Sequence, residues 1–227
     1  MSKINKKVII ATGGTGGHVL PAVGLANYLN KIGFQTSITT DLRGTKYIDM
    51  STIKDFKIIG GSTLNKKNFL FSLIKIFLAF LKSFLYLMKV KPKFIFGMGG
   101  YASFPVCMAA IFLRIPFIIY ENNLLVGRAN RILLPFAKKI FISYEEVAGI
   151  KTQYAEKKVV IGNIIREQIL NNENFTNDEP LTCLNILVLG GSQAAKVFAE
   201  ILPKIFIKCC KQDIELKIFQ QCLPEQI

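Results

Sequence analysis

Short apolar runs that alternate with longer helical stretches constrain this chain more than any other feature. The runs are rich in valine, isoleucine and phenylalanine, and those in the first 170 residues span 8–12, 36–40, 56–60, 93–97, 116–120, 139–143 and 159–162. Nearly continuous apolar strands separated by helices are typical of a parallel sheet that is covered on both faces. We therefore predict an α/β domain with a doubly wound, Rossmann-like sheet.

The pattern predicts one complete domain and the beginning of a second. Residues 1–170 contain all of these strands, and the polar segment 171–183, which includes a proline, is interpreted as a linker. A strand at 185–191, a helix at 194–211 and a strand at 216–222 then begin the same pattern again. A single βαβ unit has almost no core of its own, so residues 184–227 are expected to form an incomplete second Rossmann-like domain.

Three glycine clusters, at 13–18, 97–100 and 190–191, each follow a predicted strand and precede a predicted helix. Glycine there permits a sharp turn and a close approach of a ligand to the main chain. Free amides and the positive end of the following helix attract an anion. We expect the three loops to share one sheet edge and to bind a phosphate or diphosphate. The alternative is that the glycines only permit tight strand-to-helix turns.

The first cluster also resembles the beginning of a dinucleotide-binding loop. Gly14-Thr15-Gly16 starts the G-x-G-x-x-G pattern, and Asp41 ends the second strand where a ribose-binding acid would lie. Val19 takes the place of the third glycine, so a nicotinamide- or flavin-dependent oxidoreductase is the less favoured interpretation. No G-x-x-x-x-G-K-[ST] loop occurs in the sequence, which argues against an ATPase or GTPase of the P-loop kind.

The segment 68–90 is apolar except for lysines at every seventh position. On a helix, Lys75, Lys82 and Lys89 fall within one narrow stripe. Three interpretations stay open: a helix that packs on the sheet and offers an apolar, lysine-rimmed patch to a membrane surface, a helix that only packs in the core, or a transmembrane span. The lysines disfavour the span.

Charge and cysteine usage restrict the compartment and the partners. The formal net charge of +14 favours phosphates, nucleic acid or anionic lipid as partners. The five cysteines show neither a disulfide framework nor C-x-x-C pairs, so they are interpreted as buried thiols in a reducing cytoplasm. The N-terminal apolar run is too short for a secretory signal, so we expect a cytosolic protein or one attached to the inner face of a membrane.

Five motifs, in order, resemble the MurG family of bacterial glycosyltransferases. They are GGTGGH at 13–18, GMGGYAS at 97–103, IPFIIYENN at 115–123, GNIIR at 162–166 and VLGGSQAAK at 188–196. The resemblance implies the two-domain GT-B fold. It also implies transfer of N-acetylglucosamine from UDP-N-acetylglucosamine to lipid I, the undecaprenyl-pyrophosphoryl-linked MurNAc-pentapeptide, to form lipid II in peptidoglycan synthesis. The implied reaction is a single displacement with inversion that needs no cofactor. No Asp-x-Asp occurs to bridge a metal to a diphosphate.

The resemblance assigns roles to individual residues. Those implied to bind the donor are Thr15, Gly16, Gly17, Asn123, Arg166 and Ser192, and those implied to bind the acceptor or its diphosphate are Gly14, His18, Gly99, Gly100 and Tyr101. His18 and Glu121 are the implied catalytic residues. A histidine at a helix N-terminus tends to stay neutral, as a base must, and an arginine can pair with a phosphate oxygen.

A purely structural role is the alternative interpretation for three of these residues. His18 could cap its loop, Glu121 could satisfy main-chain amides, and Arg166 could be a surface charge. The chain also departs from three motifs that are usual in the family. Residues 120–123 are Y-E-N-N where the family has H-E-Q-N, and residues 163–166 are N-I-I-R where it has N-P-V-R. Residues 190–195 are G-G-S-Q-A-A where it has G-G-S-Q-G-A.

The same resemblance predicts where the protein acts and with what. The expected location is the cytoplasmic face of the bacterial inner membrane, where the protein would be peripheral. Expected partners are UDP-N-acetylglucosamine, lipid I, the anionic membrane surface and other cell-wall synthesis proteins, but not nucleic acid. One hypothesis from a different class stays open, a non-catalytic N-terminal fragment that only binds lipid or diphosphate.

Overall fold

The chain divides into two compact units, Met1–Asn171 and Asn172–Ile227. The computed structural model describes residues 6–49, 51–53, 55–61, 69–170, 183–191, 195–212 and 214–226. The predicted linker, 171–183, lies outside the described residues except for Cys183.

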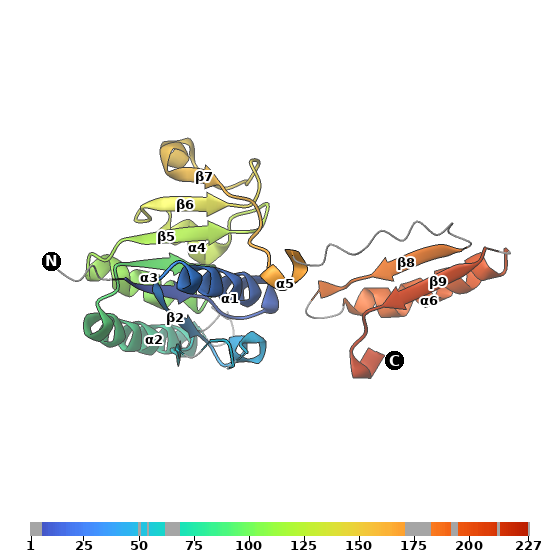
Figure 1. The fold of residues 1–227 in the computed structure, drawn as a ribbon, viewed down its shortest axis with the longest axis horizontal. Coiled ribbons are helices and arrows are strands. Elements are labelled where there is room, and N and C mark those ends of the chain that lie inside the picture. Colours follow the sequence, from blue (N-terminus) through green and yellow to red (C-terminus); the bar gives the residue numbers. More distant parts are fainter. Residues whose placement is uncertain are drawn as a thin grey trace. The chain divides into compact units, whose positions relative to one another are not determined.

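The first unit is built on a seven-stranded sheet in which every neighbouring pair is parallel (Figure 1). Its strands are β1 (Lys7–Ala11), β2 (Gln35–Thr40), β3 (Phe56–Ile58), β4 (Phe94–Gly97), β5 (Phe117–Glu121), β6 (Lys139–Ile142) and β7 (Lys158–Val160). Their order across the sheet is β3-β2-β1-β4-β5-β6-β7. The predicted strands are all present, with ends shifted by at most two residues, and the Rossmann-like fold is confirmed.

Helices cover both faces of this sheet. The side chains of Val8 and Ile10 on β1 join the core formed with α1 (Gly16–Lys31). Ile9 and Ala11 join the opposite core, formed with α2 (Phe69–Val90), α3 (Ser103–Phe112) and the end of α4 (Arg128–Leu133). Successive strand residues point to opposite faces, which explains why these strands are apolar at nearly every position.

The strand order creates a switch point beside β1. The chain leaves β1 for β2 and β3 on one side and returns to β4 on the other side. In open α/β sheets, ligands bind at such a point, outside the carboxyl ends of the strands. The loop from β1 to α1 and the loop from β4 to α3 therefore flank the expected binding crevice.

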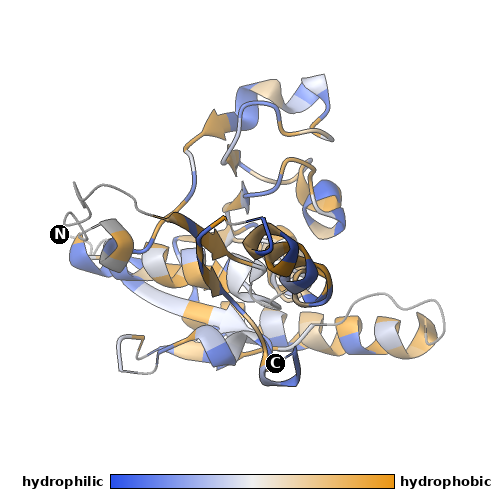
Figure 2. Cartoon of the chain, turned by 90° about the vertical axis from the view of Figure 1, so that its right-hand side faces the viewer, coloured by the Kyte–Doolittle hydropathy of each residue, from blue (hydrophilic) through white to orange (hydrophobic). Residues whose placement is uncertain are grey.

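The helix α2 packs against the rest of the first unit through a buried stripe of mostly small residues, Ser72, Ala79, Ser83 and Leu87. By length and composition alone, α2 could cross a membrane. Its other faces expose ten large apolar side chains, each at least 39% accessible: Phe69, Leu70, Phe71, Leu73, Ile74, Phe77, Leu78, Leu81, Leu85 and Met88. Apolar colour accordingly dominates this helix in Figure 2, interrupted by short hydrophilic segments.

The second unit contains a separate parallel pair, β8 (Leu184–Val188) and β9 (Leu216–Gln220), with α6 (Lys196–Cys210) between them in sequence. Among its described residues, Val188 is the one buried apolar side chain. The third glycine cluster follows β8 and so belongs to a different sheet. The prediction that all three glycine loops share one sheet edge is therefore wrong.

Candidate active site

The two glycine loops of the large sheet touch each other. A Cβ placed on Gly100 would lie 2.6 Å from the carbonyl oxygen of Gly13, and one on Gly13 would lie 2.5 Å from the Cβ of Ala102. Any side chain at either glycine would force the loops apart. An added Cβ on Gly14 or Gly17, in contrast, would meet no atom closer than 3.8 Å, an ordinary van der Waals distance. Gly13 and Gly100 therefore serve loop packing, whereas space alone does not require glycine at position 17.

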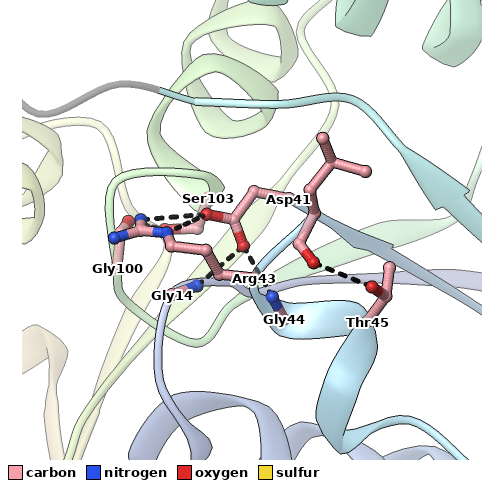
Figure 3. Close-up of polar contacts among 8 residues, drawn as sticks. Gly14, Asp41, Arg43, Gly44, Thr45, Gly100 and Ser103 are labelled. Atoms are coloured by element: carbon pink, nitrogen blue, oxygen red, sulfur yellow. Dashed lines mark hydrogen bonds and ion pairs between the residues drawn. The ribbon is translucent and has the colours of Figure 1, made fainter.

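Asp41, at the end of β2, holds the first glycine loop (Figure 3). Its buried Oδ1 accepts hydrogen bonds of 2.9 Å from the amides of Gly14 and Gly44, and its Oδ2 pairs with Arg43 at 2.9 Å. Burial opposes ionisation, but these amides and the arginine outweigh it and lower the pKa of Asp41. Because the Gly14 amide is engaged, the expectation that the loop amides are all free is wrong for this residue.

His18 lies in the first turn of α1, directly against the second glycine loop. A Cβ on Gly99 would be 3.0 Å from the imidazole ring, and Gly99 has a φ of 84°, a conformation that glycine adopts readily. Burial lowers the pKa of His18, while the charge of Glu121 and the carbonyl of Met98 act in the opposite direction. The shift favours the neutral imidazole, and its leading cause is desolvation rather than the end of the helix.

Glu121 ends β5 and accepts four hydrogen bonds from the protein itself. Its Oε1 accepts from the amide and the side chain of Asn123 at 3.2 and 2.7 Å. Its Oε2 accepts from the amide of Gly127 at 2.9 Å and from Asn130 at 3.0 Å. The side chain is 2% exposed. This carboxylate therefore fixes the loop that connects β5 to α4.

Asn122 ties that loop to α1. Pro21 lies inside α1 and has no N–H, so the carbonyl of Gly17, four residues earlier, lacks its helical donor. The side-chain amide of Asn122 donates to this carbonyl at 2.9 Å. The contact joins the first turn of α1, next to His18, to the end of β5.

These elements enclose a cavity of about 120 Å³ at the carboxyl edge of the sheet. Six of the predicted site residues line it: His18, Gly99, Gly100, Tyr101, Glu121 and Asn123. Thr15, Gly16 and Gly17 lie just before His18, at the N-terminus of α1. Arg166 lines a different groove of about 840 Å³ beside α1. Ser192 lies outside the described residues.

Sequence reasoning missed Asn130, which is 3% exposed and lines the cavity. Its side-chain nitrogen donates to Glu121, and its Oδ1 has no hydrogen-bond partner in the described part of the chain. It lies nine residues after Glu121, on a helix that no motif marked. Asp41 was noticed, but as a ribose ligand. Since its carboxylate is occupied by the loop, the structure does not favour the dinucleotide interpretation.

A doubly wound sheet with glycine loops that meet at the switch point, together with a second α/β unit, is the architecture of GT-B glycosyltransferases. Residues 8–142 match the glycosyltransferase family 28 N-terminal domain, and the chain belongs to this family.

Curated relatives share most of this chain. A protein of Rickettsia felis named UDP-N-acetylglucosamine–N-acetylmuramyl-(pentapeptide) pyrophosphoryl-undecaprenol N-acetylglucosamine transferase is 40% identical over 98% of the chain. A protein of Pelagibacter ubique with the same name is 33% identical over 96% of the chain. The chain spans 64% and 60% of their respective lengths.

The crystal structure of Acinetobacter baumannii MurG is similar to this fold. It superposes with a TM-score of 0.70 and 30% identity, covering 98% of this chain and 62% of the other. The prediction of a GT-B fold of the MurG type is confirmed.

Proposed function

We propose that this chain provides the acceptor-binding part, and the beginning of the donor-binding part, of an enzyme that transfers N-acetylglucosamine from UDP-N-acetylglucosamine to lipid I. The observation that carries the proposal is the cavity between His18, the second glycine loop and the β5–α4 loop, which gathers six predicted site residues, His18 among them. The relatives named for this reaction, similar over nearly the whole chain, support it.

In this proposal His18 accepts the proton of the acceptor hydroxyl that attacks the sugar. Desolvation lowers the pKa of His18, which favours the neutral imidazole that a general base requires. The acceptor diphosphate would lie over the glycine loops, where the α1 N-terminus provides positive potential. The acceptor oxygen would then form its bond to the anomeric carbon as the bond from that carbon to UDP breaks, so that UDP leaves and the configuration is inverted.

Glu121 takes a positioning role in the proposal. Its two oxygens already accept four hydrogen bonds, so a proton transfer through it would break the loop that it holds. Arg166 lies outside the cavity and is proposed to meet a phosphate oxygen of the donor from the neighbouring groove.

A transfer assay tests the proposal. The purified chain is incubated with UDP-N-acetylglucosamine and a short-chain lipid I analogue, and sugar transfer is measured by mass spectrometry. His18→Ala should reduce transfer by about 100-fold or more, the usual contribution of a general base. Transfer that is unchanged in His18→Ala would contradict the assignment, and binding of the analogue without any transfer would support the hypothesis of a non-catalytic binding fragment.

We further propose that the exposed apolar face of α2 attaches the protein peripherally to the cytoplasmic face of the inner membrane, whose lipid carries the acceptor. An apolar groove of about 580 Å³ runs between α2 and α3. Contiguous exposed apolar surface of this kind is typical of an interaction site. Lys75, Lys82 and Lys89 are exposed on the same helix, where anionic headgroups would attract them.

Vesicle sedimentation tests the attachment. Changing Phe77, Leu81 and Leu85 to serine should greatly reduce cosedimentation with anionic vesicles, because these side chains are 57%, 39% and 62% exposed. The matched control changes Ile32, Ile132 and Phe136, which are exposed elsewhere in the same unit, to serine. Undiminished vesicle binding by a folded α2 variant would reject the membrane proposal.

A further inference from the structure

A buried tyrosine joins β5 to residues 162–164, which follow β7. Tyr120 lies at the end of β5 and is 2% exposed, on the sheet face that α1 covers. Its hydroxyl contacts Ser143 Oγ at 2.9 Å, accepts from the amide of Ile164 at 3.1 Å and reaches the carbonyl of Gly162 at 3.4 Å. One hydroxyl therefore connects three segments.

Both main partners in this contact are departures from the family pattern described above. Where the usual H-E-Q-N motif has histidine, this chain has Tyr120, and where the usual N-P-V-R motif has proline, it has Ile164. Proline has no amide hydrogen, whereas isoleucine adds one that needs an acceptor when it is removed from water. The Tyr120 hydroxyl is that acceptor. The Ile164 amide is thus satisfied by the side chain of Tyr120.

Further contacts fasten the same segment to α1 and the sheet. A Cβ on Gly24 of α1 would lie 3.7 Å from the carbonyl oxygen of Ile165. Asn163 donates to the hydroxyl of Tyr144 at 3.2 Å. Lys31, at the end of α1, forms an ion pair with Glu167. Arg166 therefore lies in a segment that is held on both sides.

Tyr120 and Glu121, adjacent at the end of β5, hold two different segments of the chain. Neighbouring strand residues point to opposite faces of the sheet. The Glu121 carboxylate holds the loop that lines the cavity, while the Tyr120 hydroxyl holds residues 162–164 on the α1 side. We propose that Tyr120 is a positioning residue, whose bond to the Ile164 amide fixes the segment that presents Arg166. The donor-binding role of Arg166 rests on the proposed function; the bond itself does not.

Amide hydrogen exchange on the full 227-residue chain tests the bond directly. Tyr120→Phe retains the ring and removes the hydroxyl, so exchange at Ile164 should accelerate about fivefold or more, the equivalent of one net hydrogen bond. Tyr86→Phe is the matched control, because it also removes a tyrosine hydroxyl bonded to a serine, Ser37, at 2.8 Å. The proposal would be overturned if exchange of the Ile164 amide were unchanged in Tyr120→Phe. It would also be overturned if Tyr86→Phe accelerated exchange of the Ile164 amide equally.

A second variant separates positioning from general stability. Ile164→Pro restores the residue of the family motif and removes the amide that needs Tyr120. The double variant should therefore have a thermal midpoint no lower than Tyr120→Phe alone, even where Tyr120→Phe itself folds poorly. Additive losses from the two changes would contradict the coupling.

The consequence for Arg166 is read from binding of UDP-N-acetylglucosamine to the same chain. Tyr120→Phe should weaken binding, Tyr86→Phe should not, and Ile164→Pro in the Tyr120→Phe background should restore part of it. Unweakened binding in Tyr120→Phe would overturn the positioning role. If the unaltered chain does not bind this donor, the proposed function fails for Arg166, and the exchange and stability experiments still decide the Tyr120–Ile164 bond.

Discussion

His18 is the single histidine of the chain, so its titration can be followed without assignment. Burial lowers its pKa below the usual 6.5, although Glu121 and the Met98 carbonyl oppose the shift. Protonation is therefore harder in the folded chain than in the unfolded one. The resulting stability is present above pH 6.5 and is lost as the pH falls through the lowered pKa.

An NMR titration of the imidazole protons should give a pKa below 6.5. Because the negative charge of Glu121 favours the imidazolium, Glu121→Gln should lower this value further. A pKa at or above 6.5 in the unaltered chain would contradict the desolvated, neutral histidine on which the proposed base depends.

Asp41 supports the first glycine loop by a mechanism that can be tested in isolation. Asp41→Ala leaves the amides of Gly14 and Gly44 without their acceptor, so we expect a loss of about 2 to 4 kcal/mol in the free energy of unfolding. The exposed Asp55 gives the matched control, Asp55→Ala. Because the pKa of Asp41 is lowered in the folded chain, the unaltered protein should also lose stability as the pH falls below about 3.8. Asp41→Ala lacks this carboxylate and should lose less stability over the same range. Equal unfolding curves for both alanine variants would show that the carboxylate does not hold the loop.

Which partner a site residue takes could not be predicted from sequence. The position of Asp41 after a strand suits a ribose or a main-chain amide equally well, and only the path of the loop places Gly14 within reach. Asn130 gave no signal, because a buried asparagine on a short helix resembles any surface one in the sequence.

At the scale of elements, the close fit of the β4–α3 loop against α1 gives a separate prediction. Gly99→Ala introduces a strained φ and a Cβ 3.0 Å from the His18 ring. Gly60→Ala introduces the same kind of strain, at a φ of 92°, with no atom within 4 Å. The control should lose about 1 kcal/mol of stability, and Gly99→Ala should lose more and shift the His18 NMR signals. Equal losses and an unmoved histidine would mean that the loop and the ring are not in contact.

The strands and helices themselves were predictable because a parallel sheet buries both faces and leaves near-continuous apolar runs. The polar segment 171–183 also predicted a separate unit for the strands that follow it, and β8 pairs with β9 in a sheet of its own. The order of the strands within the large sheet was not predicted, because periodicity reports burial of a strand and contains no information on its neighbours.

At the scale of the whole molecule, the order of the motifs along the chain predicted the family and the GT-B fold, which are confirmed. The chain spans 60% to 64% of the relatives from Pelagibacter ubique and Rickettsia felis. The large sheet and the cavity lie within Met1–Asn171, the unit that contains both contacting glycine loops. The first unit should therefore bind the acceptor diphosphate by itself.

We propose above all that the cavity between His18 and the second glycine loop receives the diphosphate-linked sugar of the acceptor. Titrating the full chain with a short-chain lipid I analogue, while recording the imidazole signals, tests it most directly. We predict saturable shifts of the His18 signals that Gly99→Ala weakens and Gly60→Ala does not. Saturable binding of the analogue, measured by calorimetry, with unmoved His18 signals would contradict the account.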